Sequence, residues 1–280
     1  MIAFGPSLEP FTELRPGIRR LLAPNPSMMT GPGTNTYLLG QERIAVIDPG
    51  PAIESHIDRI IEFAGAPVEW ILVTHTHPDH SPGASLLARK TGAELIGRPA
   101  PEGPQQDATF SPDYFLGDAE RLETSEFVLE GVHTPGHASN HVCYLHTGSN
   151  WLFTGDHVID GSTVVINPPD GNMKQYIDSL RRVRNLECTA LAPGHGDVIT
   201  DPERVIDWTI EHRLERESKV AAALSANPGL TARELVPHVY QDVDRKLYGL
   251  AERSLLAHLE KLVEDHRASL SDGRWSLTDG

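Results

Sequence analysis

The chain has 280 residues, of which 39% are hydrophobic and 22% are charged, and its formal net charge is −15 at pH 7. These values are ordinary for a soluble globular protein of one or two domains, and no apolar stretch approaches the roughly 20 residues of a membrane-spanning helix. Residues 1–210 carry most of the negative charge, with 14 basic and 27 acidic residues, and such a body repels nucleic acid at long range.

The amino-terminal segment MIAFGPSLEP has no basic region followed by an apolar run, so the sequence predicts a cytoplasmic protein without a secretory signal. Cys143 and Cys188 lie in apolar, strand-like surroundings and lack the spacing of metal ligands. We therefore expect both cysteines to be small buried hydrophobic residues, and we expect no disulfide framework.

Apolar runs of strand length alternate with helical patterns through the first 225 residues. Residues 35–39 and 44–47 predict two strands, and the tetrapeptide DPGP at 48–51 ends the second. The segment 98–118 is rich in Pro, Gly and Asp, and we expect it to form a long loop over one end of the domain. Further strands are expected at 70–74, 95–96, 121–122, 127–129, 142–145, 151–153 and 190–191, and helices at 53–64, 81–91, 172–183 and 202–223.

The sequence changes character from about residue 225 onward. The break ANPG at 226–229 is followed by Thr231 and Glu234, which match a helix-capping box. Residues 247–265 predict a helix with a leucine-rich face, and 268–277 predict a small hairpin around the turn SDG. Three helices and a hairpin are the order of a winged helix, so we expect two domains, 1–210 and 211–280.

The densest chemical signal is the heptapeptide THTHPDH at 74–80, which follows an expected strand directly. Imidazole nitrogens and carboxylate oxygens are the ligands that zinc takes in proteins. His75 and His77 can point together from an extended loop, and Asp79 and His80 can face a second metal ion beside the first. The cluster therefore predicts a site for two metal ions.

Three later turns each add one residue of ligand type after an apolar strand. These turns are TPGH, which ends at His137, TGD, which ends at Asp156, and PGHG, which contains His195. A lone histidine in a turn means little, but three such turns together with the cluster indicate that the fold gathers these side chains at one edge of a sheet.

The set HxHxDH, TPGH, TGD and PGHG resembles the metallo-β-lactamase superfamily over residues 17–200. This resemblance implies an α+β fold, a four-layer αββα sandwich, which is followed here by the small winged-helix-like domain. It also implies two divalent ions, with zinc expected and iron or manganese as alternatives. The implied ligands are His75, His77 and His137 for the first ion, Asp79, His80 and His195 for the second, and Asp156 as the bridge between them.

The segments GTNTYL at 33–38 and LLAHLEKL at 255–262 resemble the β-lactamase-like protein 2 group, which has the same carboxy-terminal extension. Eukaryotic members of this group are associated with cleavage of single-stranded RNA. Related members act as thioesterases on carrier-protein-bound polyketides. The resemblance therefore leaves the substrate open.

Differences between this sequence and the motifs of related families limit the reactions that we expect. Class B β-lactamases usually place a cysteine in the second metal site and are exported, whereas this chain has Asp156 after Thr-Gly, so we do not expect β-lactam hydrolysis. Flavodiiron proteins have glutamate where His77 stands, so His77 favours hydrolysis over redox iron chemistry. Glyoxalase II-like enzymes share the ligands but have a different carboxy-terminal part, which binds glutathione. We do not find that part in this sequence, so we do not expect this activity.

The ligand set predicts catalysis by a metal-bound hydroxide. Two divalent ions about 3.5–4 Å apart can share a water molecule and lower its pKa to about 7, so that hydroxide attacks a carbonyl or phosphoryl centre. Asp79 is the expected catalytic residue, because a ligand of the second ion can also orient the nucleophile. Our first hypothesis is an ester or thioester hydrolase that acts on a small-molecule or carrier-bound substrate.

Two other functions compete with the first hypothesis. The alternative is a single-stranded RNA endoribonuclease, which the resemblance over both domains supports. A non-catalytic DNA-binding regulator fits poorly, because the ligand set is complete and the helix 247–265 has no basic stripe. We expect no membrane partner, and a homodimer is an open alternative to a monomer.

Some polar residues near the motifs are weaker candidates. Asn140 follows the His137 turn and is either a substrate contact or a turn-stabilising residue, and Thr34 and Asn35 either border the site or serve a turn. We expect His141 and His157 to be structural, because strand alternation points them away from the metals. The histidines expected on helix surfaces are His56, His212, His238, His258 and His266.

Overall fold

The computed structural model describes residues 11–241 and 243–278. These residues form two compact units, each assembled from separate stretches of the chain. The first unit contains residues 11–134, 140–164 and 186–202, and the second contains 135–139, 165–185 and 203–278. Residues 1–10, on which the expectation about a secretory signal rests, lie outside the described residues. None of the described helices has the length and apolar character needed to cross a lipid bilayer.

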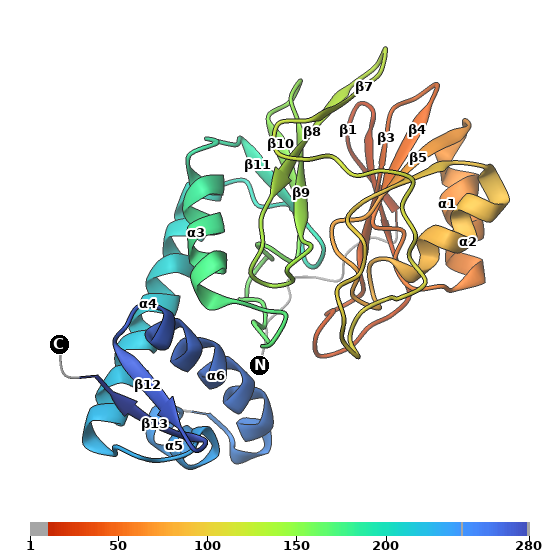
Figure 1. Ribbon diagram of the computed structural model, residues 1–280. Coiled ribbons are helices and arrows are strands. Elements are labelled where there is room, and N and C mark those ends of the chain that lie inside the picture. The colour runs from red at the N-terminus through yellow and green to blue at the C-terminus, as the bar shows by residue number, and fades with distance from the viewer. Residues whose placement is uncertain (1–10, 242, 279–280) are drawn as a thin grey trace. The chain divides into compact units, whose positions relative to one another are not determined.

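The first unit is built on two β-sheets (Figure 1). In the first sheet, β1 to β4 pair antiparallel in sequence order, and β5 and β6 then continue in parallel. Helices α1 and α2 make the connections between the parallel strands. The bounds are β1 (Phe11–Arg15), β2 (Ile18–Leu22), β3 (Asn35–Leu39), β4 (Ile44–Ile47), α1 (Glu54–Ala64), β5 (Val68–Leu72), α2 (Pro82–Thr91) and β6 (Glu94–Ile96).

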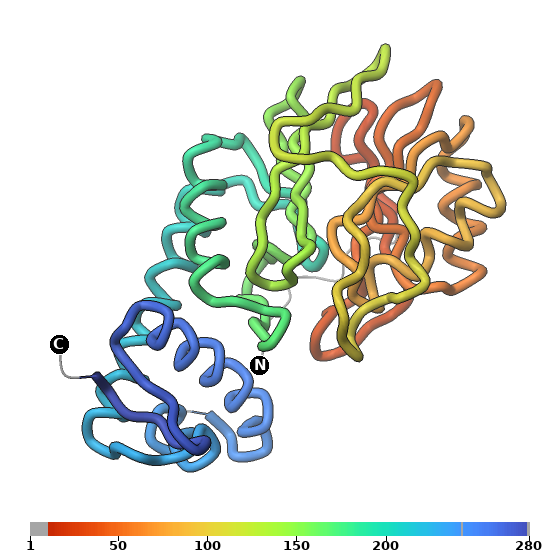
Figure 2. Tube along the Cα trace, in the orientation of Figure 1, coloured from red at the N-terminus to blue at the C-terminus, as the bar shows by residue number. Residues whose placement is uncertain are grey.

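The second sheet has five strands in the order β11, β10, β9, β8, β7. Its pairs are antiparallel except for β10 and β11, which are parallel. The bounds are β7 (Arg121–Glu123), β8 (Val128–His133), β9 (Val142–His146), β10 (Trp151–Gly155) and β11 (Ala190–Pro193). The segment between β6 and β7 forms no helix or strand, as expected for the long loop, and Figure 2 traces its path in yellow-green.

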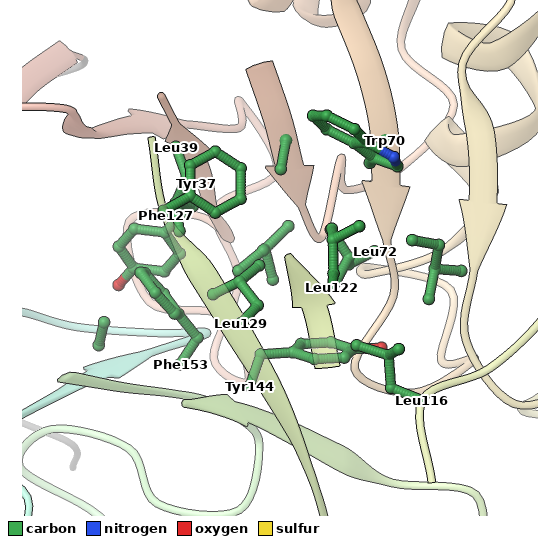
Figure 3. Close-up of a cluster of buried hydrophobic side chains, with 14 of the residues drawn as sticks. Tyr37, Leu39, Trp70, Leu72, Leu116, Leu122, Phe127, Leu129, Tyr144 and Phe153 are labelled. Atoms are coloured by element: carbon green, nitrogen blue, oxygen red, sulfur yellow. The ribbon is translucent and has the colours of Figure 1, made fainter. Parts of the chain in front are cut away.

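The main core lies between the two sheets (Figure 3). Alternate side chains of each strand point inward, and Tyr37 of β3 meets Phe153 of β10 with ring centroids 5.0 Å apart. Each fully buried side chain of this size stabilises the fold by about 1.5–3 kcal/mol. The buried tyrosines also bond the carboxyl ends of two strands, because the Tyr37 hydroxyl donates to O of Pro193, the last residue of β11, over 2.8 Å, and the Tyr144 hydroxyl to O of Val73, which follows β5, over 2.9 Å.

The other face of the first sheet is covered by α1 and α2. Ile57 and Ile60 of α1 and Leu87 of α2 are completely buried against it. His56 of α1 is also fully buried, and its Nε2 lies 3.1 Å from Thr36 Oγ1, so the expected helix-surface position is wrong for this histidine.

The second unit is mostly helical and contains α3 (Met173–Arg184), α4 (Pro202–Ala226), α5 (Ala232–Val239), a 3₁₀ turn (Arg245–Leu247), α6 (Tyr248–Glu264) and the hairpin β12 (Ala268–Ser271) and β13 (Arg274–Leu277). The predicted capping box is present, because Thr231 and Glu234 bond each other's backbone N–H groups. The proposed boundary between residues 210 and 211 falls inside the continuous helix α4.

A separate core holds the carboxy-terminal helices and hairpin together. It is formed by apolar residues of α4, α5, α6 and β13, among them Leu224, Leu235, Leu259 and Trp275. His258 of α6 is 0% exposed, so it does not occupy the expected helix surface. Its position follows the apolar face of α6, since the neighbouring Leu259 is buried with it.

Candidate metal centre

The loop that carries the histidine cluster begins where β5 ends. Its backbone turns tightly, because the N–H of His80 donates to His77 O over 3.0 Å, and α2 starts two residues later at Pro82. Strands β4 and β5 are parallel neighbours, so their carboxyl ends lie at the same edge of the sheet. The cluster therefore emerges at this edge, beside the loop that follows β4.

Asp79, His80 and His195 form one compact group. Their ligand atoms lie within 4.8 Å of one another, which is close enough to surround one ion. The Oδ2 atom of Asp79 is 3.6 Å from His80 Nε2 and 3.2 Å from His195 Nε2. The structure thus brings together the three residues that the family resemblance implies for the second ion.

Asp156 lies at the junction of two such groups. Its Oδ1 atom is 3.5 Å from His80 Nε2 and 3.3 Å from His195 Nε2, and it also forms a group with His75 and His80. A carboxylate that reaches His75 on one side and His195 on the other has the position that a bridge between two ions needs.

Two of the three residues assigned to the first ion lie side by side in the first unit. His75 Nε2 lies 3.0 Å from His77 Nδ1, so these two imidazoles face each other within the first unit. His137 belongs to the second unit, where its Nδ1 donates to Val165 O over 2.7 Å. That hydrogen bond occupies Nδ1, so Nε2 is the nitrogen with which His137 would bind a metal.

The surroundings of the His80 Nε2 atom show whether a metal ion fits between the candidate ligands. It is buried and has no hydrogen-bond partner within residues 11–241 and 243–278, although two carboxylate oxygens lie 3.5 and 3.6 Å away. A buried imidazole nitrogen without a partner costs free energy, and a cation bound between it and the carboxylates removes that cost. The donors are nitrogen and carboxylate oxygen, which suit zinc and also iron or manganese.

The electrostatics of the group also favour bound positive charge. Burial opposes a charge on His80, but the carboxylates of Asp79, Asp156 and Asp48 raise its pKa well above the usual range. Burial likewise disfavours ionised Asp79, yet the imidazoles of His80 and His195 lower the pKa of that carboxyl to about 2. Divalent ions would therefore replace protons on these histidines.

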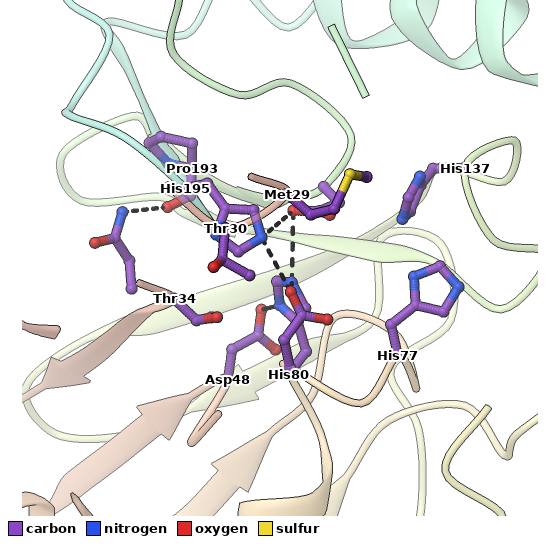
Figure 4. Close-up of polar contacts among 12 residues, drawn as sticks. Met29, Thr30, Thr34, Asp48, His77, His80, His137, Pro193 and His195 are labelled. Carbon is purple, nitrogen blue, oxygen red and sulfur yellow. Dashed lines mark hydrogen bonds and ion pairs between the residues drawn. The ribbon is translucent and has the colours of Figure 1, made fainter. Parts of the chain in front are cut away.

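Asp48 orients His80 from the end of β4, and the sequence did not single it out (Figure 4). Its Oδ2 accepts a hydrogen bond from His80 Nδ1 over 2.8 Å and another from Thr74 Oγ1 over 2.7 Å. Its Oδ1 accepts from the Thr74 N–H over 2.8 Å. The available signal was a carboxylate at the end of a strand that is parallel to the strand preceding the histidine cluster.

Two glycines allow the ligand turns to approach closely. A Cβ on Gly194 would lie 2.7 Å from His80 Cε1 and 3.0 Å from Asp156 Oδ1. Gly155 has φ +46°, and a Cβ there would lie 2.4 Å from Thr74 Oγ1. The glycines of TGD and PGHG are thus required by packing around the ligands.

The weaker candidates support loops around the site. Asn35 is fully buried, and its Nδ2 donates to Pro193 O and to Gly196 O, both over 2.9 Å. Asn35 therefore holds the turn that carries His195. Thr34 is also fully buried and bonds Asn25 through both its N–H and its hydroxyl.

Asn140 is buried as well, and so are the two histidines expected to be structural, His141 and His157. Asn140 Nδ2 donates to Thr76 Oγ1 over 2.8 Å and to Pro99 O over 3.2 Å, so it connects the ligand loop to the long loop. His141 and His157 are 0% exposed, and His141 Nδ1 lies 2.9 Å from Thr134 Oγ1. Neither histidine belongs to a group of potential ligands among the described residues.

Two family models match the chain. The model of the metallo-beta-lactamase superfamily matches residues 29–195, and that of the beta-lactamase associated winged helix domain matches residues 231–275. A Drosophila melanogaster protein named beta-lactamase-like protein 2 homolog is 31% identical over 274 residues, which cover 93% of this chain and 92% of the relative.

Two further proteins are similar to this chain. The thioesterase pkgB of Emericella nidulans is 33% identical over 210 residues, which cover 74% of this chain and 58% of that protein. The crystal structure of a metallo-beta-lactamase family protein from Thermus thermophilus superposes with a TM-score of 0.80 at 22% identity, over 95% of this chain and 100% of that one. The predicted αββα sandwich with a carboxy-terminal winged helix is confirmed by these matches.

Proposed function

Because this chain belongs to the metallo-beta-lactamase superfamily of metal-dependent hydrolases, we propose that it hydrolyses an ester or thioester with two divalent ions, zinc first among them. The main support for a metal site is the buried Nε2 atom of His80. It has no hydrogen-bond partner in the described residues and faces the carboxylates of Asp79 and Asp156. The proposed ligands are His75, His77, Asp79, His80, His137, Asp156 and His195.

The metal ions, Asp79 and Asp48 would have separate roles in hydrolysis. Divalent ions bound here would supply Lewis acidity and lower the pKa of a water molecule, which ester and thioester cleavage at neutral pH requires. Asp79 keeps its carboxylate ionised beside His195, so it can accept a hydrogen bond from the attacking water and orient it. Asp48 would fix the His80 ring through its Nδ1 hydrogen bond.

Charge and similarity support a small-molecule or carrier-bound substrate. The net charge of −15 disfavours the approach of a polynucleotide, whose phosphates are negative as well. The similarity to the thioesterase pkgB points in the same direction. Single-stranded RNA is the alternative substrate, and binding to it would weaken steeply as salt concentration rises.

A substrate panel tests the proposal. Metal-replete protein is assayed with an acyl thioester, a lactone, bis(p-nitrophenyl) phosphate and a fluorescent single-stranded RNA, and each assay is repeated with Asp156→Ala. Asp58→Ala is the control, because Asp58 is an exposed residue of α1. We expect thioester or lactone cleavage in the wild type and in Asp58→Ala, and a loss of at least about 100-fold in Asp156→Ala.

The other outcomes are equally informative. Cleavage of RNA but not of thioester, abolished by Asp156→Ala, would replace the proposal with the endoribonuclease. Full activity of an Asp156→Ala protein that has lost no metal would exclude the proposed ligand set. The cytoplasmic location remains a prediction, which cell fractionation checks, and analytical ultracentrifugation decides between a monomer and a homodimer.

A further inference from the structure

One face of α3 holds the turn that leads to His137. Asn172 caps the helix and Ser179 lies two helical turns further along, so the two residues share a face. The Asn172 N–H donates to Gly136 O over 2.8 Å, and the Ser179 hydroxyl donates to Pro135 O over 2.8 Å. The two residues that precede His137 in the chain are therefore both bonded to α3.

The turn also lies directly on the backbone of this helix. A Cβ on Gly136 would lie 2.3 Å from the Cα atom of Tyr176 and 2.5 Å from its N atom. Gly136 has φ +143°, a backbone conformation that also favours glycine. The glycine of TPGH therefore allows a close backbone contact with α3, and this contact brings Pro135 O within reach of the Ser179 hydroxyl.

Helix α3 is itself held by the carboxy-terminal helices of the same unit. Tyr176 is 1% exposed, and the Arg213 guanidinium of α4 lies 5.4 Å from the centroid of its ring. The Asn172 Nδ2 atom donates to Glu264 Oε1 of α6 over 2.7 Å. Within the second unit, the place of the His137 turn thus depends on three helices.

Burial distinguishes the Ser179 bond from the side-chain bond on the other side of His137. Ser179 is 5% exposed, whereas Ser139, whose hydroxyl donates to the Asp170 carboxylate, is an exposed residue. Water replaces a hydrogen bond that is lost at the surface, but a bond made by a buried donor is shielded from water, and its loss costs more. We therefore expect Ser179, rather than Ser139, to determine how firmly the turn is held.

We propose that Ser179 is a positioning residue for His137 and thereby sets the affinity of the protein for the first metal ion. This inference rests on the proposed function, in which His137 is a ligand of that ion. The bond to Val165 O fixes the rotation of the His137 ring, and the bond from Ser179 fixes the backbone from which the ring projects. Loss of a group that orients a ligand typically weakens metal binding about 10- to 100-fold.

The binding of the second ion should not depend on Ser179. The proposed ligands of that ion all belong to the first unit, whereas α3 belongs to the second. These ligands are Asp79, His80 and His195, with Asp156 as the bridge. A change confined to the first ion therefore separates a positioning role from a general loss of stability, which would weaken the binding of both ions.

Calorimetric titration of the metal-free protein with zinc tests this role. The wild type, Ser179→Ala and His137→Ala are compared, and the binding step that His137→Ala loses is the step of the first ion. We expect Ser179→Ala to weaken that step about tenfold and to change the other step less than about twofold. Alanine favours the helical conformation, so α3 itself is kept.

Thr209→Val is the matched control in the same unit. Thr209 of α4 is 2% exposed, and its hydroxyl donates to Val205 O over 2.7 Å, so this variant also removes a buried hydroxyl that is bonded to a backbone carbonyl. We expect Thr209→Val to keep both binding steps of the wild type. Urea unfolding of the metal-free proteins checks that both variants are folded.

The outcomes distinguish this inference from the proposed function. If the wild type binds no zinc, or if His137→Ala binds it like the wild type, the proposed ligand set fails and Ser179 has no ligand to position. If His137→Ala loses one step but Ser179→Ala keeps both wild-type affinities, the ligand set stands and the positioning role is overturned. Weakening of both steps alike in Ser179→Ala, or an equal weakening in Thr209→Val, also overturns it.

Discussion

The carboxylate of Asp48 accepts a hydrogen bond from Nδ1 of His80 over 2.8 Å, and the side chains of Asp48 and His80 are 3% and 0% exposed to solvent. This bond fixes the orientation of the ring and directs its Nε2 toward Asp79 and Asp156. A metal-binding imidazole that is held in this way needs less ordering when the ion arrives.

Replacement of Asp48 by Asn is therefore expected to weaken metal binding about 10- to 100-fold while the fold is kept. Asn tolerates the left-handed backbone at this position, where φ is +50°. Its neutral amide oxygen makes a weaker hydrogen bond with His80 Nδ1 than the carboxylate does, and its NH₂ group cannot accept the hydrogen bond that Oδ1 receives from the Thr74 N–H. Zinc affinity is measured by competition with a chelator. Asp58→Asn, on the surface of α1, is the control, and identical affinities for the two variants would rule out the positioning role.

Gly194→Ala tests how closely the ligand turns must approach. The new methyl carbon would lie 2.7 Å from His80 Cε1, so we expect a displaced imidazole, at least about tenfold weaker metal binding and a loss of about 1–3 kcal/mol in stability. Gly249→Ala is the matched control, because nothing lies within 4 Å of a Cβ there and alanine favours the helix. Isothermal calorimetry with zinc and urea unfolding measure both effects. Unchanged zinc affinity in Gly194→Ala would show that the turn that carries His195 can accommodate a methyl group without displacing the His80 ring.

The candidate ligands could be proposed from the sequence because their motifs are local, and the helix-capping box of Thr231, which the structure confirms, could be predicted for the same reason. Asp48 was missed because its partners lie 26 and 32 residues later in the chain, and only the parallel pairing of β4 and β5 brings them together. His258 was misplaced because a histidine has no strong preference for the interior or the surface, so its residue type alone does not settle its position. Its position beside the buried Leu255 and Leu259 already indicated the apolar face.

Glu217 anchors two cations in the second unit. Its carboxylate lies 2.7 Å from Lys261 Nζ and 2.6 Å from Arg267 Nη1, and its side chain is 7% exposed. We expect Glu217→Gln to lower the free energy of unfolding by about 2–4 kcal/mol, because the buried lysine loses part of its charge compensation.

Urea unfolding followed by circular dichroism measures this loss. Glu252→Gln is the control, since its partner Arg233 is 85% exposed, and such a pair contributes less than about 1 kcal/mol. A Glu217→Gln protein as stable as Glu252→Gln would mean that Asp265, 2.6 Å from Lys261 Nζ, compensates the lysine alone.

His258 makes the stability of the second unit depend on pH. Burial, together with the nearby charges of Arg213 and Arg216, lowers the pKa of this imidazole to about 3. In the unfolded chain the pKa is about 6.5. Between these values the unfolded state binds one more proton, so the stabilisation is complete above about pH 6.5 and is lost as pH falls toward about 3.

His258→Leu is expected to remove this dependence. Below about pH 6.5 the wild type should lose up to about 1.4 kcal/mol per pH unit more than the variant, because one proton is linked to unfolding. Urea unfolding is measured between about pH 7.5 and 5 with a chelator present, so that release of metal does not contribute. His238→Leu, at an exposed position of α5, carries the same change of residue and should keep the slope of the wild type. Parallel curves for the wild type and His258→Leu would mean that His258 becomes protonated in the folded protein, with a cation accommodated in the core of the helices.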